Sequence, residues 1–202
     1  MLYNIFKNLF LGILKLFAGL KVTGKENIPE NGPALIVANH ISNWDPMVLG
    51  SDLKRQVKFI AKEELVKIPL IGLLIKAWGV VPIKRGRGDR EAIGKSLEIL
   101  GNQHLMGIFI EGRRNTVHPE QMLKPQHGAA MLAVKTGVPV IPAVIINSNK
   151  IFRSFKRVRV VFGAPIQFTE EAGADKKELY EQISNRLVQE IMKLKAAAAK
   201  GF

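Results

Sequence analysis

Short apolar segments alternate with segments of helical period along most of the chain. Residues 33–38 form an apolar run after a turn signal at 30–32, whereas residues 88–101 repeat their apolar positions every three or four residues. This pattern predicts strands at 33–38, 57–61, 79–83, 106–110, 138–146 and 158–162, and helices at 47–52, 68–77, 88–101, 128–136 and 176–194. Strands that alternate with helices indicate an α/β fold: a single domain with a mostly parallel or mixed central sheet flanked by helices.

The first 20 residues are apolar over most of their length and read as a separate amphipathic helix. A helix that spans a bilayer needs about 20 apolar residues in a row, and Lys7 and Lys15 interrupt this segment, so we expect neither a transmembrane span nor a signal peptide. On a helical wheel Asn4, Lys7, Asn8 and Lys15 fall within an arc of about 100°. The alternatives are a helix packed on the core of the protein and a helix in the membrane interface with its lysines toward lipid phosphates. The wide apolar arc favours the interface for residues 1–20.

Composition narrows the possible chemistry further. The 202 residues include no cysteine, which excludes disulfides, thiolate metal sites and a thiol nucleophile. The net charge is +13, and the whole excess lies before Glu170. Such a basic body indicates an anionic partner: nucleic acid, a lipid surface, a phosphorylated substrate or an acidic protein. Charge by itself does not choose among these partners.

His40 and Asp45 follow the first predicted strand of the domain. Histidine is the usual general base near neutral pH, and it works better when a carboxylate holds its second ring nitrogen. On one helix a spacing of five residues would set the two side chains about 140° apart, but a strand-to-helix turn can fold Asp45 back onto His40. The alternative is structural: Asp45 caps a helix that begins at Pro46, and His40 is a satisfied histidine at a strand end.

Arginines follow two other predicted strands, at Arg85 and Arg114. Because ligands of open α/β sheets bind at the carboxyl ends of strands, both guanidinium groups can converge on one anion. Backbone N–H groups around Gly112 can add donors, and Glu111 can accept a substrate hydroxyl or hold an arginine. The alternative is a surface cluster of ion pairs. No spacing of His, Asp and Glu suggests a metal site.

Four ordered motifs over about residues 20–165 together carry a resemblance. They are Asn39-His40-x4-Asp45, the segment from Gly79 to Arg85, Phe109 with Glu111-Gly112 and Arg114, and Val138-Pro139-x-x-Pro142. In these residues the chain resembles the glycerophospholipid acyltransferase family. The resemblance implies an enzyme that transfers an acyl group to the sn-2 hydroxyl of 1-acylglycerol-3-phosphate and so forms phosphatidic acid. It implies an acyltransferase domain, to which we assign residues 21–195; the alanine-rich residues 196–202 are expected to be a tail without a function.

The resemblance also assigns roles to the site residues. His40, oriented by Asp45, would deprotonate the acceptor hydroxyl, which attacks the thioester of acyl-CoA or acyl-acyl-carrier protein without a cofactor. Transfer would be direct, although Ser42 leaves a covalent route open. The expected binding residues are Arg85, Arg114 and Gly112 at the phosphate, Lys62 as a further phosphate candidate, and Glu111 at the glycerol or at an arginine.

Partners and location follow from the same reading. We expect a peripheral, monotopic protein on the cytoplasmic face of the cell membrane, bound to the phospholipid surface, to lysophosphatidic acid and to its acyl donor. One alternative is an acyltransferase for glycerol-3-phosphate or another lysophospholipid. The other is a non-catalytic basic module on membranes or nucleic acid. Nucleic acid is not expected, because only Phe152 and Phe155 interleave the basic residues of 150–159.

Overall fold

The central strand β2 (Ala34–Ala38) lies in the middle of a seven-stranded sheet with the order β1-β7-β6-β2-β5-β3-β4. A computed structural model describes residues 2–67, 71–83, 88–154, 156–169 and 175–200. The other strands are β1 (Lys21–Thr23), β3 (Val57–Lys62), β4 (Val80–Ile83), β5 (Leu105–Phe109), β6 (Val140–Ile146) and β7 (Arg159–Phe162). Neighbouring strands are parallel except β6 and β7, which pair antiparallel. The predicted α/β fold with a mostly parallel sheet is confirmed.

Strand β2 is central because all of its residues are apolar and buried. Successive side chains of a strand point to opposite faces of the sheet. Ala34, Ile36 and Ala38 accordingly belong to one hydrophobic core, and Leu35 and Val37 belong to a second core on the other face. A strand that is covered on both faces in this way reads in sequence as a continuous apolar run.

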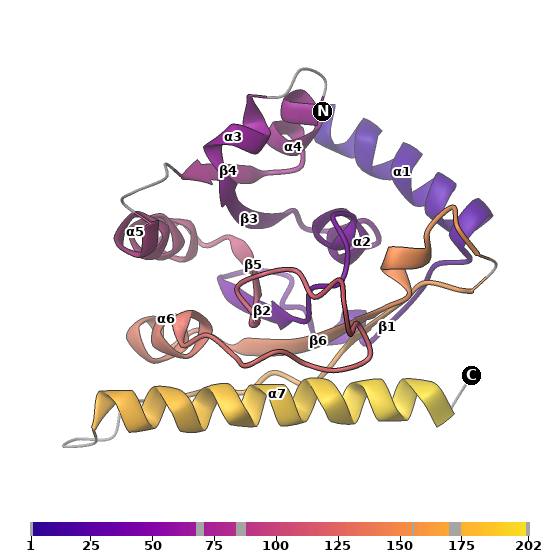
Figure 1. The fold of residues 1–202 in the computed structure, drawn as a ribbon. Coiled ribbons are helices and arrows are strands. Elements are labelled where there is room, and N and C mark those ends of the chain that lie inside the picture. The colour runs from indigo at the N-terminus through magenta and orange to yellow at the C-terminus, as the bar shows by residue number, and fades with distance from the viewer. Residues whose placement is uncertain (1, 68–70, 84–87, 155, 170–174, 201–202) are drawn as a thin grey trace.

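Helices cover both faces of the sheet (Figure 1). On one face lie α1 (Leu2–Ala18) and α2 (Asp45–Gly50), which contribute side chains to the first core; α3 (Glu63–Val66) and α4 (Ile71–Ala77) follow β3 at that end of the sheet. On the other face lie α5 (Gly88–Gly101), α6 (Gly128–Thr136) and the long α7 (Lys176–Lys200). Two 3₁₀ turns, at Lys25–Asn27 and Ser148–Lys150, complete the elements of the described residues.

Helix α1 packs on the core on one side and exposes apolar side chains on the other. Leu14 is fully buried, whereas Leu9 is 60% and Leu16 77% exposed. The lysines do not point freely outward: Lys7 Nζ donates to the Leu53 carbonyl at 2.9 Å, and Lys15 lies 3.5 Å from an Asp52 carboxylate oxygen. The helix therefore combines both alternatives, since it covers the core and leaves a second apolar face uncovered. Among the described residues, no helix is long and apolar enough to cross a membrane.

Several elements differ from the predicted boundaries. Helix α7 continues through the alanines to Lys200 instead of ending at Leu194, because alanine is the best helix former. Ala198 is buried there, and its carbonyl accepts a hydrogen bond from Arg159. Helix α2 begins at Asp45, two residues early, and residues 68–70 of the predicted helix 68–77 lie outside the described residues. The short elements β1 and α3 were not predicted, since neither carries an apolar run of its own.

Candidate active site

The carboxyl ends of three neighbouring parallel strands meet at one edge of the sheet. His40 lies just beyond β2, Glu111 just beyond β5 and Ser148 just beyond β6. The buried side chain of Asn39 ties two of these strands together: its amide nitrogen donates to the Ile145 carbonyl at 2.9 Å, and its oxygen accepts from the Ile145 N–H at 2.8 Å. The position of His40 relative to β6 is therefore set by a pair of hydrogen bonds.

The structure brings His40 and Asp45 together, as their spacing allows. His40 Nδ1 lies 2.7 Å from Asp45 Oδ2. Because a carboxylate only accepts hydrogen bonds, this contact places a proton on Nδ1, so that in the neutral imidazole the lone pair is on Nε2. The His40 side chain is 20% exposed and the Asp45 side chain is fully buried. A histidine that is partly exposed to solvent, with one ring nitrogen held by a buried carboxylate, has the arrangement needed to remove a proton from a hydroxyl.

Asp45 has more partners than its histidine. Its Oδ2 accepts hydrogen bonds from the N–H groups of Ile41 at 2.7 Å and Ser42 at 2.8 Å, and its Oδ1 accepts one from the Ser148 hydroxyl. These donors compensate the cost of burying a carboxylate. The alternative role as a helix cap does not hold: Asp45 is already inside α2, and its carboxylate is turned back toward the preceding turn. Sequence analysis missed Ser148, which has no motif of its own.

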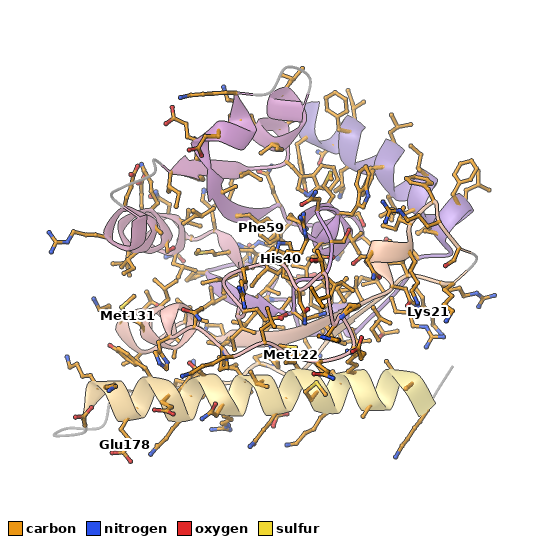
Figure 2. The ribbon with its side chains drawn as sticks, viewed as in Figure 1. Lys21, His40, Phe59, Met122, Met131 and Glu178 are labelled. Carbon is orange, nitrogen blue, oxygen red and sulfur yellow. The ribbon has the colours of Figure 1, made fainter. Side chains whose placement is uncertain are left out.

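An aromatic stack supports the histidine ring. The rings of His40 and Phe109 are nearly parallel with centroids 4.1 Å apart, and Phe109 stacks in turn on Phe59 at 5.7 Å. Figure 2 shows His40 and Phe59 near the middle of the molecule. Gly107 makes room for this stack, because a Cβ atom at that position would lie 2.2 Å from the Phe59 ring. The stack limits rotation of His40 and keeps Nδ1 on Asp45.

Glu111 is buried and bound by backbone groups. One carboxylate oxygen accepts from the His40 N–H at 2.9 Å, and the other accepts from the Leu123 N–H at 3.1 Å. No arginine of the described residues pairs with it, although an arginine or a substrate hydroxyl was the expected partner. Glu111 thus connects the backbone of His40 to the backbone of Leu123, which lies later in the loop that follows β5.

Gly112 shapes the loop that carries Arg114. Its φ of 65° lies in the left-handed region, and a Cβ atom would come within 2.7 Å of Gln126 Cγ. Its own N–H donates to the Phe109 carbonyl at 3.0 Å.

Lys195 of α7 contacts the later part of the same loop. Its ammonium group donates to the carbonyls of Glu120 at 2.7 Å and Pro119 at 3.3 Å. Burial lowers the pKa of Lys195, against the opposite effect of nearby carboxylates.

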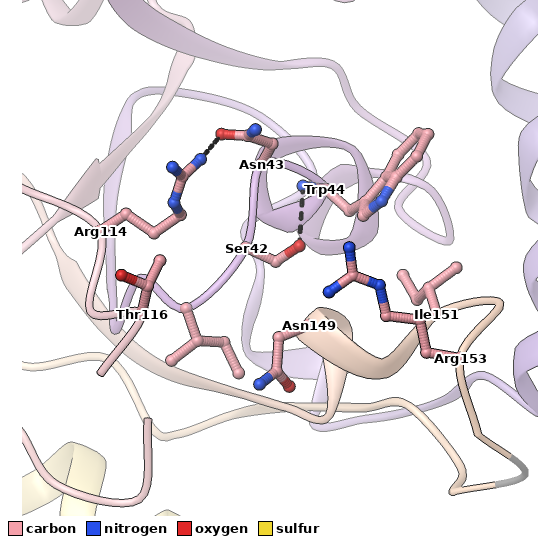
Figure 3. A pocket seen from close by; sticks show the side chains of 9 residues that line it. Ser42, Asn43, Trp44, Arg114, Thr116, Asn149, Ile151 and Arg153 are labelled. Atoms are coloured by element: carbon pink, nitrogen blue, oxygen red, sulfur yellow. Dashed lines mark hydrogen bonds between the residues drawn. The ribbon is translucent and has the colours of Figure 1, made fainter. Parts of the chain in front are cut away.

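A pocket of about 350 Å³ opens beside the turn that follows His40. Its walls include the turn from Ile41 to Trp44, the loop residues Arg114 and Thr116, and Asn149, Ile151 and Arg153 from beyond β6 (Figure 3). Arg114 donates a hydrogen bond to the Asn43 side-chain oxygen. This volume is at the small end of ligand pockets, and its lining offers cationic and neutral polar groups.

Of the predicted binding residues, Lys62 is placed only in part and Arg85 is not placed. Lys62 ends β3 at the same edge of the sheet, and the structure describes its backbone alone. Arg85 lies outside the described residues. In the described ranges, no group of three or more His, Asp or Glu side chains could bind a metal ion.

A family model described as Acyltransferase matches residues 19–146 of the chain. The 1-acyl-sn-glycerol-3-phosphate acyltransferase of Borreliella burgdorferi is 32% identical over 140 residues, which cover 67% of this chain and 55% of that protein. The protein of the same name from Bacillus subtilis is 27% identical over 197 residues, 96% of each chain. The chain spans about half the length of the first curated relatives that it matches.

A solved structure extends this similarity to the fold. The crystal structure of the 1-acyl-sn-glycerophosphate acyltransferase PlsC from Thermotoga maritima superposes with a TM-score of 0.70 at 26% sequence identity. The superposition covers 96% of this chain and 79% of the Thermotoga chain. The likeness therefore includes α1 and α7, beyond the region that the family model matches.

Proposed function

This chain belongs to the acyltransferase family, and we propose that it acylates the sn-2 hydroxyl of 1-acylglycerol-3-phosphate to give phosphatidic acid. The acyl donor is acyl-CoA or acyl-acyl-carrier protein, and the reaction needs no cofactor. The names of the relatives support this acceptor. One observation carries the proposal: the 2.7 Å contact between His40 Nδ1 and Asp45 at the carboxyl edge of the sheet, next to a pocket that contains Arg114.

The transfer proceeds in two steps at His40. Nε2 accepts the proton of the sn-2 hydroxyl while the hydroxyl oxygen attacks the thioester carbonyl carbon, and Asp45 stabilises the imidazolium that forms. The tetrahedral intermediate then collapses, the carbon–sulfur bond breaks, and the imidazolium returns the proton to the leaving thiolate. Ser42 does not favour a covalent route, because its hydroxyl accepts a hydrogen bond from the Trp44 N–H at 3.2 Å and makes no hydrogen bond with the His40 ring among the described residues.

The remaining predicted site residues bind or position the acceptor. Arg114 binds the acceptor phosphate from the pocket wall, and Arg85 and Lys62 remain further predicted phosphate-binding residues. Glu111 positions the base through the His40 N–H instead of touching substrate. Gly112 allows the sharp turn that presents Arg114.

A membrane location suits a substrate with one acyl chain. The exposed apolar face of α1 consists of Ile5, Leu9 and Leu16, and Phe17 lies beside it. We expect this face to lie in the membrane interface, so that residues 1–20 attach the domain of residues 21–195 to the phospholipid surface as a peripheral, monotopic protein. The net charge of +13 favours an anionic leaflet, as on the cytoplasmic side of a cell membrane.

The proposal is tested by acyl transfer in detergent micelles or lipid vesicles. Labelled lysophosphatidate is offered with acyl-CoA and, in parallel, with acyl-acyl-carrier protein. The unaltered chain is expected to form phosphatidate, and His40→Ala to lower kcat by a factor of about 100 or more, since general-base catalysis typically contributes that much. His104→Ala is the matched control, because His104 is an exposed histidine in the turn between α5 and β5.

Each outcome separates one alternative. Product from His40→Ala at the full rate would remove His40 as the base. Product with glycerol-3-phosphate or another lysophospholipid, and none with lysophosphatidate, would change the acceptor and keep the reaction type. No product with any acceptor or donor would favour a non-catalytic membrane-binding module.

A further inference from the structure

The loop between β6 and β7 brings an arginine to the pocket that no acyltransferase motif includes. Arg153 lines the pocket, and in Figure 3 its guanidinium group points toward Ser42 and Trp44 from the side opposite Arg114. The residue before it, Phe152, has a left-handed φ of 61°. Its ring centroid lies 6.2 Å from that of Trp44 and 6.4 Å from that of Phe17. These ring contacts hold the turn that directs Arg153 into the pocket.

The pocket has positive charge that its own walls do not neutralise. None of the nine described residues that line it is acidic, and Arg114 and Arg153 are its two charged side chains. Arg114 is bonded to the neutral Asn43, and no carboxylate of the described residues pairs with Arg153. A second cavity, of about 460 Å³ around Asp52, differs in this respect, because Lys25 pairs with Asp52 there. Of these two cavities, the pocket that begins at Ile41 is therefore the one suited to an anion.

The position of the pocket directly after His40 in the chain restricts what this anion can be. Ile41 and Ser42, which form one wall, directly follow His40 in sequence. In lysophosphatidate only two carbon atoms and one oxygen separate the sn-2 hydroxyl from the phosphorus. A phosphate that stays bound while His40 takes the hydroxyl proton must lie next to the histidine. Because the pocket begins at Ile41, the residue after His40, it is the cavity to which we assign this phosphate.

We propose that Arg153 is a second phosphate-binding residue and that it holds the phosphate monoester of the acceptor together with Arg114. This inference rests on the proposed function, because it deepens the assignment of the same site. A guanidinium group can donate two parallel hydrogen bonds to one phosphate, and two such groups on opposite walls select a doubly charged monoester over a diester headgroup. The 3′-phosphate of CoA is also a monoester, so the test has to separate acceptor from donor.

Binding of two soluble probes to the full chain tests the assignment without catalysis. Glycerol 3-phosphate carries the acceptor headgroup, and adenosine 3′,5′-bisphosphate carries the 3′-phosphate monoester of CoA; both are titrated by calorimetry. Arg153→Gln is expected to raise the Kd for glycerol 3-phosphate about tenfold, the loss of one charge-assisted contact, with Arg153→Lys in between. Lys156→Gln, which removes the same charge from the same loop outside the pocket, is expected to stay within about twofold.

Kinetics give a second readout. Arg153→Gln is expected to raise the KM for lysophosphatidate and leave kcat and the KM for acyl-CoA nearly unchanged. A KM for acyl-CoA that rises alone, a Kd that rises only for the bisphosphate, or effects equal to those of Lys156→Gln would each overturn the inference. So would an unaltered chain that does not bind glycerol 3-phosphate. If the chain binds glycerol 3-phosphate through Arg153 but transfers no acyl group, the proposed reaction fails and the phosphate site stands.

Discussion

The Ser148 hydroxyl donates a hydrogen bond to Asp45 Oδ1, although 103 residues separate the two in sequence. Ser148 is fully buried, and it contacts the carboxylate oxygen that His40 does not contact. The two oxygens of Asp45 therefore have different partners. Oδ1 accepts from Ser148, and Oδ2 contacts His40 and the turn that follows it. Ser148 fixes the plane of the carboxylate, and through it the orientation of the base.

We predict that Ser148→Ala lowers kcat about tenfold and leaves the KM for lysophosphatidate nearly unchanged. The variant also loses about 1–3 kcal/mol of unfolding free energy, since one carboxylate oxygen remains buried without its donor. Steady-state kinetics and urea unfolding measure the two effects. Ser96→Ala is the matched control, because Ser96 is also buried but donates only to the Ala92 carbonyl within α5. A variant that loses stability with no change in kcat would make the role of Ser148 purely structural.

Asp45→Asn is predicted to lower kcat by a factor of about 10³ while the protein stays folded; the same change in a Ser-His-Asp triad costs about 10⁴. The amide oxygen can replace Oδ2, and the amide nitrogen can face Ser148, whose hydroxyl then accepts instead of donating. The hydrogen bonds survive, and the charge that stabilises the imidazolium is lost. Kinetics together with circular dichroism test this prediction. Collapse of the fold would instead assign the main role of Asp45 to stability.

Gly107→Ala is predicted to be harmful although glycine to alanine often stabilises a protein. The added methyl group would meet the Phe59 ring and displace the stack that supports His40. We expect a loss of about 1–3 kcal/mol in unfolding free energy, typical of an overpacked core, together with a lower kcat. Gly94→Ala, in α5 with nothing within 4 Å of the new atom, should instead stabilise the protein by about 0.5–1 kcal/mol. Thermal unfolding of both variants and kinetics of Gly107→Ala give the comparison.

The outer face of α1 is predicted to decide membrane binding. Leu9→Gln and Leu16→Gln together should lower partitioning onto anionic vesicles at least tenfold, because burial of each leucine contributes about 1.5–3 kcal/mol. Asn8→Gln, an exposed polar position of the same helix, should leave it unchanged. Co-sedimentation with vesicles measures the difference. Equal binding of both variants would mean that another surface attaches the protein to lipid.

Much of this arrangement could be predicted from the sequence, because buried strands and the residues that follow them leave local signals. The continuous apolar run of β2 predicted a central strand, and His40 and Asp45 are brought into contact at the turn that follows it. Ser148 and Arg153 left no such signal, since their roles depend on the pairing of β2 with β6 and on the path of the loop after β6. Functional residues of open α/β sheets follow the carboxyl ends of strands, and Ser148 obeys this rule because it lies just beyond Ile146.

Glu111 shows a different limit. A carboxylate shortly before two arginines in sequence indicated an arginine or a substrate hydroxyl as its partner, and the structure gives it two backbone N–H groups instead. Backbone donors leave no trace in a sequence, because every residue except proline carries one. The same holds for α1: its lysines contact a turn that follows α2, a partner that a helical wheel cannot show.

The paired hydrogen bonds between Asn39 and Ile145 also bear on how the sheet assembles. Strands made of apolar residues such as β2 and β6 can slide along each other at little cost in hydrophobic contact. A slip by one residue would leave the Asn39 amide buried with neither of its partners, at a cost of about 1–3 kcal/mol for each unsatisfied group. Asn39 thus penalises the wrong alignments during folding, and a chain that pairs these strands incorrectly cannot bring Ser148 to Asp45.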